Sequence, residues 1–276
     1  MKTGRVDLRD VQSTMLVTLY LRALESRDAN PILGDRFAAD AVRRIDYDWT
    51  RLSKRSVTNS RYGVALRGRQ LDDWAADFLS RHPDATVLHM ACGLDSRAFR
   101  LDPPAGVRWF DVDLPDVIEL RRKLYDESGN YRMIASSVTD SAWLDEIPTD
   151  KPGLIIAEGL LMYLRENEVR ELLKRLTDHF PSGELIFDGV APWMAKATQL
   201  LKKNFGRWYG DYPAYWTPMR DESDVERWNP RLRLREHVAL VSRYERIPDP
   251  GLRRMYGLGS RFGWFRNFLR VFRAEF

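Results

Sequence analysis

Cysteine is nearly absent from the sequence, since Cys92 is the only one among 276 residues. A single cysteine excludes an intrachain disulfide and a thiolate zinc cluster, and it is typical of a protein from a reducing cytoplasm. Long apolar runs are also absent, because the longest candidate, residues 153–164, is interrupted by Glu158. The polar N-terminus lacks the apolar core of a signal peptide. We therefore expect a cytoplasmic protein with no membrane partner.

A large excess of charge is missing as well. The 44 Lys and Arg residues nearly balance the 40 Asp and Glu residues, which leaves a net charge of +4. This balance permits an anionic substrate but does not call for a nucleic-acid partner. The excess is local to the C-terminal part of the chain, where we interpret the arginines as a solvated basic face: Arg253, Arg254, Arg261, Arg266, Arg270 and Arg273.

The order of apolar patterns indicates an α/β fold. Residues 1 to about 80 are predicted to be helical, and from residue 86 short apolar runs alternate with helical segments. Strands alternating with helices predict a parallel, doubly wound sheet. The expected strands cover residues 86–91, 107–114, 132–138, 153–159 and 184–190, with 232–241 and 265–276 as two closing strands.

Three helical patterns are clear enough to place. One apolar stripe recurs at helical spacing before the first strand, and another follows the fourth strand. Pro115 occupies a position where a first helical residue is expected after the second strand. The two stripes consist of Leu71, Trp74, Ala75, Phe78 and Leu79, and of Val169, Leu172, Leu173 and Leu176.

Residues 191–231 break this alternation. The segment shows no regular helix or strand periodicity and is rich in aromatic residues. They are Trp193, Trp208, Tyr209, Tyr212, Tyr215, Trp216 and Trp228. Aromatic side chains at this density suit either a core plug or a flat apolar slot for a ring-shaped ligand.

Two features at the ends of the first two strands indicate a nucleoside-containing cofactor. A turn of small residues runs from Ala91 through Gly93, and Asp113 follows about 20 residues later, next to Leu114. In a doubly wound sheet such a turn lets the backbone approach a ligand, and such an acid accepts hydrogen bonds from ribose hydroxyls. The G-x-G-x-x-G fingerprint that cradles a dinucleotide pyrophosphate is absent. S-adenosylmethionine, which has ribose but no phosphate, therefore fits better than NAD.

Two further carboxylates stand out. Glu158 lies among apolar residues at the end of the fourth strand, where an unpaired charge costs several kcal/mol. It pairs either with a nearby arginine or with the cationic methionine end of the cofactor. Asp140, after the third strand, either contacts adenine or caps the following turn.

At these residues the chain resembles the leucine carboxyl methyltransferase family, and within it the bacterial polyketide O-methyltransferases of the tetracenomycin-synthesis type. The likeness spans roughly residues 11–240, and its blocks are specific in combination. They lie at residues 45–49, 87–101, 109–124, 157–164 and 227–230.

The resemblance implies a class I methyltransferase fold with a seven-stranded sheet. An N-terminal helical cap (1–80) would precede the cofactor-binding domain (81–276), with an acceptor-site insertion at 191–231. It implies Arg67 as the partner of the cofactor carboxylate, since arginine matches a carboxylate with two parallel hydrogen bonds. Arg61 and Arg69 are rivals that spacing does not exclude. Gly93 and Glu158 would lie at the methionine end, Asp113 at the ribose and Asp140 near adenine. The family usually has glycine at Ala91, whose extra methyl group narrows the space for the cofactor.

The acceptor is expected to be a small aromatic carboxylic acid or polyketide. Methyl transfer to a carboxylate cancels two charges and needs no general base, only positioning in a dry site. A phenol needs a base, and none of the four histidines, His82, His89, His179 and His237, has catalytic spacing. A hydroxyl methyltransferase on the same fold and a non-catalytic or RNA-directed family member remain the alternatives. The expected acceptor contacts are Met162, Tyr163, Trp193 and Tyr215.

Overall fold

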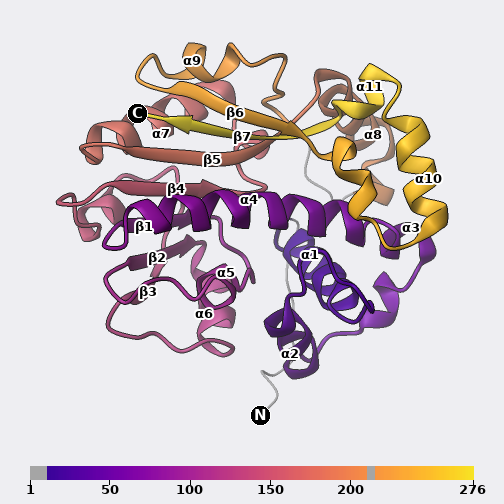
Figure 1. Ribbon diagram of the computed structural model, residues 1–276, viewed down its shortest axis with the longest axis horizontal. Helices are drawn as coiled ribbons and strands as arrows, with labels where there is room; N and C mark the ends of the chain where they lie inside the picture. The colour runs from indigo at the N-terminus through magenta and orange to yellow at the C-terminus, as the bar shows by residue number, and fades with distance from the viewer. Residues whose placement is uncertain (1–10, 210–214) are drawn as a thin grey trace.

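The structure is a computed structural model that describes residues 11–209 and 215–276. Its centre is a seven-stranded sheet with the strand order β3-β2-β1-β4-β5-β7-β6 (Figure 1). The strands agree with the seven predicted segments to within a few residues. They are β1 (Thr86–Met90), β2 (Arg108–Asp113), β3 (Tyr131–Ala135), β4 (Gly153–Ala157), β5 (Gly183–Val190), β6 (Arg233–Ala239) and β7 (Leu269–Glu275).

One strand departs from the predicted parallel sheet. Strands β1 to β5 pair in parallel, but β7 lies between β5 and β6 and is antiparallel to both. Antiparallel neighbours can be joined at one end of a sheet, whereas parallel neighbours need a crossover. The connection from β6 to β7 stays at one end, through η4 (Leu240–Arg246), α10 (Pro250–Gly259) and α11 (Gly263–Arg266) (Figure 1).

Helices cover both faces of the sheet and enclose two cores. On one face α4 (Arg61–Arg81) lies over the sheet (Figure 1), and its predicted stripe, including Leu71 and Phe78, is buried. The other face carries α7 (Glu166–His179), η2 (Ala142–Glu146) and α9 (Asp224–Trp228). In α7 the four predicted core positions are at most 1% exposed. Short α5 (Arg97–Arg100) follows β1, α6 (Pro115–Arg122) begins with the predicted proline, and η3 (Leu161–Tyr163) follows β4.

The N-terminal helices cover the end of the sheet where the site is expected. Helix α1 (Val11–Glu25) packs against α2 (Arg36–Arg44) and α4. The Asp35 side chain caps α2 by accepting a hydrogen bond from the Ala38 N–H at 2.9 Å. The short helices η1 (Trp49–Leu52) and α3 (Arg55–Thr58) lead into α4. The boundary at residue 80 stays a prediction, since α4 belongs to the same core as the sheet.

The expectation of irregular structure over residues 191–231 is wrong for its first half. Helix α8 spans Pro192–Tyr209, and the aromatic residues within it obscure its periodicity in the sequence. Trp228 is buried in the sheet core on α9, whereas Trp216 is 53% exposed. Tyr212 lies outside the described residues, as do the side chains of Trp208 and Tyr209. Within residues 11–209 and 215–276, no helix combines the length and apolar character needed to cross a membrane.

Candidate active site

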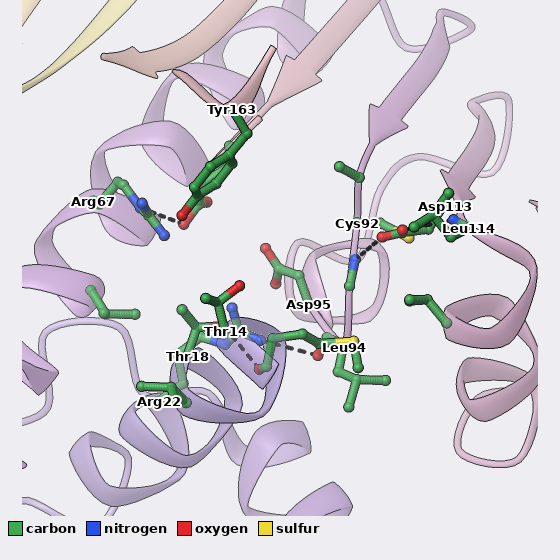
Figure 2. A pocket seen from close by; sticks show the side chains of 18 of the residues that line it. Thr14, Thr18, Arg22, Arg67, Cys92, Leu94, Asp95, Asp113, Leu114 and Tyr163 are labelled. Carbon is green, nitrogen blue, oxygen red and sulfur yellow. Dashed lines mark hydrogen bonds and ion pairs between the residues drawn. The ribbon is translucent and has the colours of Figure 1, made fainter. Parts of the chain in front are cut away.

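A cavity of about 400 Å³ lies at the carboxyl ends of β1, β2 and β4. The turn after β1, the end of β2 and the turn after β4 form its base, and side chains of α1, α4 and α8 cover it. Figure 2 shows Arg67 and Tyr163 on one side, Asp113 and Leu114 on the other, and Asp95 between them. The volume and position are those of a small-molecule site in a doubly wound fold.

The turn after β1 and the acid after β2 are joined by hydrogen bonds. The Gly93 N–H donates to Asp113 Oδ2 at 2.7 Å, and the Leu114 N–H donates to Asp113 Oδ1 at 2.7 Å. Both Ala91 (φ +48°) and Gly93 (φ +51°) adopt the left-handed conformation, which costs alanine more than glycine. Burial raises the pKa of the Asp113 carboxyl, although both N–H groups favour its charged form. The backbone thus fixes an acid at the cavity edge.

A buried ion pair beneath the turn holds it in place. Arg121 on α6 forms an ion pair with Asp111 of β2, and it also donates to the Gly93 carbonyl at 3.1 Å. The Tyr131 hydroxyl donates to the same Asp111 carboxylate at 2.6 Å. Burial alone raises the pKa of Asp111, but Arg121, with smaller contributions from His89 and Tyr131, lowers it to about 2. The pair is therefore charged at neutral pH and ties the turn to the sheet.

On the opposite side of the cavity, Arg67 joins two acidic strand ends. Its Nε donates to Glu158 Oε1 at 2.8 Å, and its Nη1 donates to Asp188 Oδ2 at 2.8 Å. Arg97 donates to the second Glu158 oxygen at 2.6 Å. Burial alone raises the pKa of Glu158, but the two arginines together lower it to about 2. Of the two partners expected for Glu158, the structure thus shows the arginine. The Glu158 carboxylate also lines the cavity, where a cofactor could reach it.

This ion-pair network continues behind the cavity and has an excess of negative charge. Arg97 also pairs with Asp72 and Asp95, Arg100 pairs with both of these and Asp35, and Arg22 pairs with Asp35. Five carboxylates in the network face four guanidinium groups, which leaves one net negative charge. The carboxylates are Asp35, Asp72, Asp95, Glu158 and Asp188, and the guanidinium groups belong to Arg22, Arg67, Arg97 and Arg100. The net negative charge of this network favours a cationic ligand in the cavity.

The remaining lining is less polar and includes the side chain of Lys202. Tyr163 and Tyr215 lie with ring centroids 5.2 Å apart beside Arg67, and burial raises the pKa of both phenols. Thr198, Leu201 and Lys202 line the cavity from one face of α8, at helical spacing. No carboxylate in the described parts of the chain pairs with Lys202. This side of the cavity combines aromatic surface with a positive charge.

Most of the predicted site residues lie around this cavity. The structure brings together six of the seven residues expected at the cofactor and two of the four expected at the acceptor, although their contacts with a ligand stay predictions. The lining includes Arg67, Ala91, Gly93, Asp113, Leu114, Glu158, Tyr163 and Tyr215. The rival arginines lie elsewhere, since Arg61 pairs with Asp28 and Arg69 pairs with Asp73.

Three predicted site residues lie away from the cavity lining. Met162 is 3% exposed and packs behind it, against Val190 and Ala195. Trp193 is 39% exposed, and its ring contacts Trp264 at a centroid distance of 5.6 Å. Asp140 lies in an exposed turn, where its backbone carbonyl accepts a hydrogen bond from Arg175 at 2.7 Å.

Several residues of this site were not predicted from the sequence. Asp188 carries the same signal that identified Glu158, a carboxylate within an apolar strand, and its side chain is fully buried. Arg97 gave no such signal, because an arginine four residues after a glycine turn is equally consistent with an exposed helix. Lys202 was not recognised as a site residue because α8, the helix that carries it, was not predicted.

The reversed final strand, the three-layer arrangement and the cavity beside an acid at the end of β2 define a class I methyltransferase. A candidate methyltransferase from Thermobifida fusca YX shares this fold with a TM-score of 0.63 and 15% identity, covering 96% of this chain and 94% of that one. The family model of leucine carboxyl methyltransferase matches residues 15–177. The chain belongs to the leucine carboxyl methyltransferase family.

Two relatives agree with this assignment. The tetracenomycin polyketide synthesis O-methyltransferase TcmP of Streptomyces glaucescens is 52% identical over 200 residues, covering 71% of this chain and 73% of the relative. The S-adenosyl-L-methionine-dependent methyltransferase dpfgK of Gibberella zeae is 34% identical over 296 residues, covering 96% of this chain and 90% of the relative. The protein is an S-adenosylmethionine-dependent O-methyltransferase, as the sequence predicted.

Proposed function

We propose that the protein methylates a carboxylate of an aromatic, polyketide-type small molecule. One observation carries this proposal: every histidine and carboxylate that lines the cavity is already engaged, while Lys202 has no carboxylate partner among the residues that the structure describes. A site without a free base suits an acceptor that needs no deprotonation. The name of the Streptomyces glaucescens relative, which refers to polyketide synthesis, supports the acceptor class.

The residues around the cavity fit S-adenosylmethionine. Arg67 and Glu158 lie side by side and offer a cation and an anion, which match the carboxylate and the ammonium group of an amino-acid zwitterion. Asp113 is fixed at the opposite side, where it would accept hydrogen bonds from ribose hydroxyls. The net negative charge of the network complements a ligand with a net positive charge.

When bound, S-adenosylmethionine supplies a methyl group attached to a positively charged sulfur. The task of the protein is to hold an acceptor oxygen in line with that methyl group and to exclude water. The helices α1, α4 and α8 cover the cavity and would provide this exclusion. The carboxylate of the acceptor is already charged at neutral pH, so no proton has to be moved before the transfer.

The engaged side chains make general-base catalysis a poor fit. His89 lies within 3.2 Å of Asp111 and 3.4 Å of Arg97, one on each ring nitrogen. The pKa of Glu158 is lowered to about 2, chiefly because two arginines oppose the effect of burial, so this carboxylate is a weak base. Burial raises the pKa of Tyr163 above that of a free phenol, so it stays protonated. A phenolic acceptor would find no partner for its proton among these residues.

Lys202 provides a receptor for the acceptor carboxylate. Its ammonium group would bind one carboxylate oxygen and leave the other to attack the methyl group. Methylation converts the anion into a neutral ester, so the attraction to Lys202 disappears with the reaction and favours product release. Tyr163 and Tyr215 would contact the rings of the acceptor from the adjacent side.

A labelling experiment tests the proposal. The enzyme is incubated with methyl-labelled S-adenosylmethionine and a panel of aromatic carboxylic acids, each paired with the phenol of the same ring system. We expect label in the acids, and it should be released by mild base because it is held in an ester. Label that resists base would indicate an ether and would favour the hydroxyl methyltransferase instead.

Substitution of Lys202 tests its role, and substitution of Lys203 is the matched control. Lys202→Met should raise the KM for acid acceptors by about tenfold, which corresponds to the loss of one charge-assisted contact. Lys203→Met removes the same charge from the neighbouring position, which does not line the cavity, and should leave the KM unchanged. Equal effects of both substitutions would mean that only the overall charge matters.

A further inference from the structure

The C-terminal helices present apolar side chains to solvent. Met255, Leu258, Phe262 and Trp264 are between 52% and 62% exposed, and Trp264 contacts the half-exposed Trp193 of α8. Figure 1 shows α8, α10 and α11 gathered at one end of the molecule. Helix α10 contains no buried residue at all. A cluster of large, exposed apolar side chains on a folded protein marks a site of interaction.

Three arginines line a hollow together with one of these apolar side chains, Leu258. An open hollow of about 500 Å³ is lined by Arg253, Arg254 and Arg261 together with Tyr244 and Leu258. Within the described residues, none of the three guanidinium groups has a carboxylate partner. The sequence between Asp249 and Glu275 contains six arginines and no carboxylate side chain. The hollow is therefore basic, and Tyr244 and Leu258 make part of its lining apolar.

We propose that this basic apolar surface, residues 250–266 with Trp193, binds the surface of a membrane that contains anionic phospholipids. Tryptophan, phenylalanine and leucine insert at the boundary of headgroups and acyl chains, while arginines bind the phosphates beside them. Leu258 lines the hollow together with the three arginines, so both kinds of contact are available there. The absence of acidic side chains removes the repulsion that would oppose binding.

Two other occupants fit the surface less well. In a symmetric dimer this patch would meet itself, and residues 250–274 contain no carboxylate that could pair with the arginines of the other copy. An RNA partner would use the arginines and could stack on Trp264, but it gains nothing from exposed aliphatic residues such as Met255 and Leu258. A bilayer uses both kinds of side chain.

The proposal differs from the sequence expectation of no membrane partner. That expectation was based on the absence of a spanning segment, whereas surface binding needs only an apolar and basic face. The inference does not depend on the identity of the methyl acceptor. It does have a consequence for an apolar acceptor, which would be concentrated in the bilayer at which the enzyme binds.

Sedimentation with lipid vesicles tests the proposal. Full-length protein is mixed with vesicles of phosphatidylcholine alone or of phosphatidylcholine with phosphatidylglycerol. We expect co-sedimentation with the anionic vesicles and little with the neutral ones. Raising the salt concentration should release the protein, because the attraction between exposed charges is screened.

Matched variants locate the binding surface. Replacing Arg254 or Arg261 with Gln should weaken vesicle binding by about fivefold each, which corresponds to about 1 kcal/mol per arginine. Trp264→Ser should weaken it without changing its dependence on anionic lipid. Arg132→Gln, on the exposed face of β3 at the opposite edge of the sheet, removes the same charge and should have no effect.

Four results would overturn the proposal. Two concern the vesicles: equal sedimentation with neutral and anionic vesicles, and full inhibition of vesicle binding by inorganic phosphate at physiological concentration. The third is a dimer in solution that depends on Arg254 and Trp264. The fourth is retention on RNA that requires the same arginines, without binding to vesicles. Methyl transfer to a water-soluble acceptor by Trp264→Ser shows that the variant is folded. A failure of membrane binding is thereby separated from a failure of the proposed activity.

Discussion

Arg67 and Glu158 form an ion pair 2.8 Å long, although 91 residues separate them in the sequence. The family resemblance assigns the first to the carboxylate of the cofactor and the second to its methionine end. In the structure Arg67 and Glu158 pair with each other, so the site holds a positive and a negative group side by side before any ligand binds. A zwitterion can bind to this pair without leaving either side chain unpaired. Arg67 keeps its contact with Asp188, and Glu158 keeps its contact with Arg97.

The first prediction concerns the charge of Glu158. Glu158→Gln keeps the shape but removes the charge that two arginines share, so both stability and cofactor affinity should fall. We expect a loss of about 2 kcal/mol in the free energy of unfolding, below the roughly 3–5 kcal/mol for a fully broken buried pair, because Arg67 and Arg97 keep other carboxylates. Denaturant titration measures the stability, and calorimetry with S-adenosylmethionine measures the affinity.

A double-mutant cycle with Arg67→Met separates the two effects. If the pair acts as a unit, the double variant should be less destabilised than the sum of the single variants. Lost stability with unchanged affinity for the cofactor would show that Glu158 is purely structural. Lost affinity with unchanged stability would show that the ion pair contributes nothing to the fold.

The second prediction concerns Asp113. Asp113→Ala removes the acceptor that the backbone holds at the edge of the cavity, and we expect S-adenosylmethionine to bind about 1.5–3 kcal/mol more weakly. Asp140→Ala is the informative companion, because the resemblance places Asp140 near adenine whereas its turn lies outside the cavity lining. A comparable loss in that variant would support the adenine contact, and unchanged calorimetric affinity would remove it. Unchanged affinity in a folded Asp113→Ala protein would exclude Asp113 from the site.

The third prediction concerns the left-handed conformation of Ala91. A left-handed alanine costs about 1–2 kcal/mol, while glycine loses about 0.5–1 kcal/mol more backbone entropy on folding. Ala91→Gly should therefore raise the free energy of unfolding by at most about 1.5 kcal/mol. Because the methyl group lines the cavity, its removal should also tighten cofactor binding. Weaker binding in calorimetry would instead mean that this methyl group makes a favourable contact.

The fourth prediction concerns stability in acid. The pKa of Glu158 is lowered from 4.5 to about 2, and that of Asp111 from 3.8 to about 2, because nearby arginines outweigh the effect of burial. A lowered pKa in the folded state stabilises the fold above the unfolded pKa, and this stabilisation is lost as the pH falls. Asp113 and Asp188 have raised pKa values and act in the opposite direction.

The free energy of unfolding should therefore fall between about pH 4.5 and pH 2, with the raised pKa values of Asp113 and Asp188 moderating the fall. Asp111→Asn should start from a lower stability at pH 7 and show a shallower decline. Urea titrations at several pH values measure both quantities. Parallel curves for the variant and the wild type would mean that Asp111 does not titrate as proposed.

The sequence predicted β1 to β5 because these parallel strands are short, mostly apolar and bounded by turns. The two closing strands are present as well, although β7 is antiparallel to its neighbours. The sequence predicted Gly93 and Asp113 because strand ends meet at one edge of such a sheet. It did not predict that Arg97, on a four-residue helix, reaches Glu158, since this contact depends on tertiary packing. It also missed α8, because residues that serve the cavity, the core and the surface interrupt the periodicity of an amphipathic helix.

The last prediction distinguishes two aromatic residues that the sequence treated alike. Tyr215 lines the cavity beside Tyr163, whereas Trp193 lies on the outer surface of α8 against Trp264. Tyr215→Ala should raise the KM for an aromatic acceptor by about two- to twelvefold, as the loss of a ring contact worth about 0.5–1.5 kcal/mol implies. Trp193→Ala should leave that KM within about twofold, and cofactor affinity should change little in either variant. A larger effect of Trp193→Ala than of Tyr215→Ala would place the acceptor outside the cavity, towards the exposed end of α8.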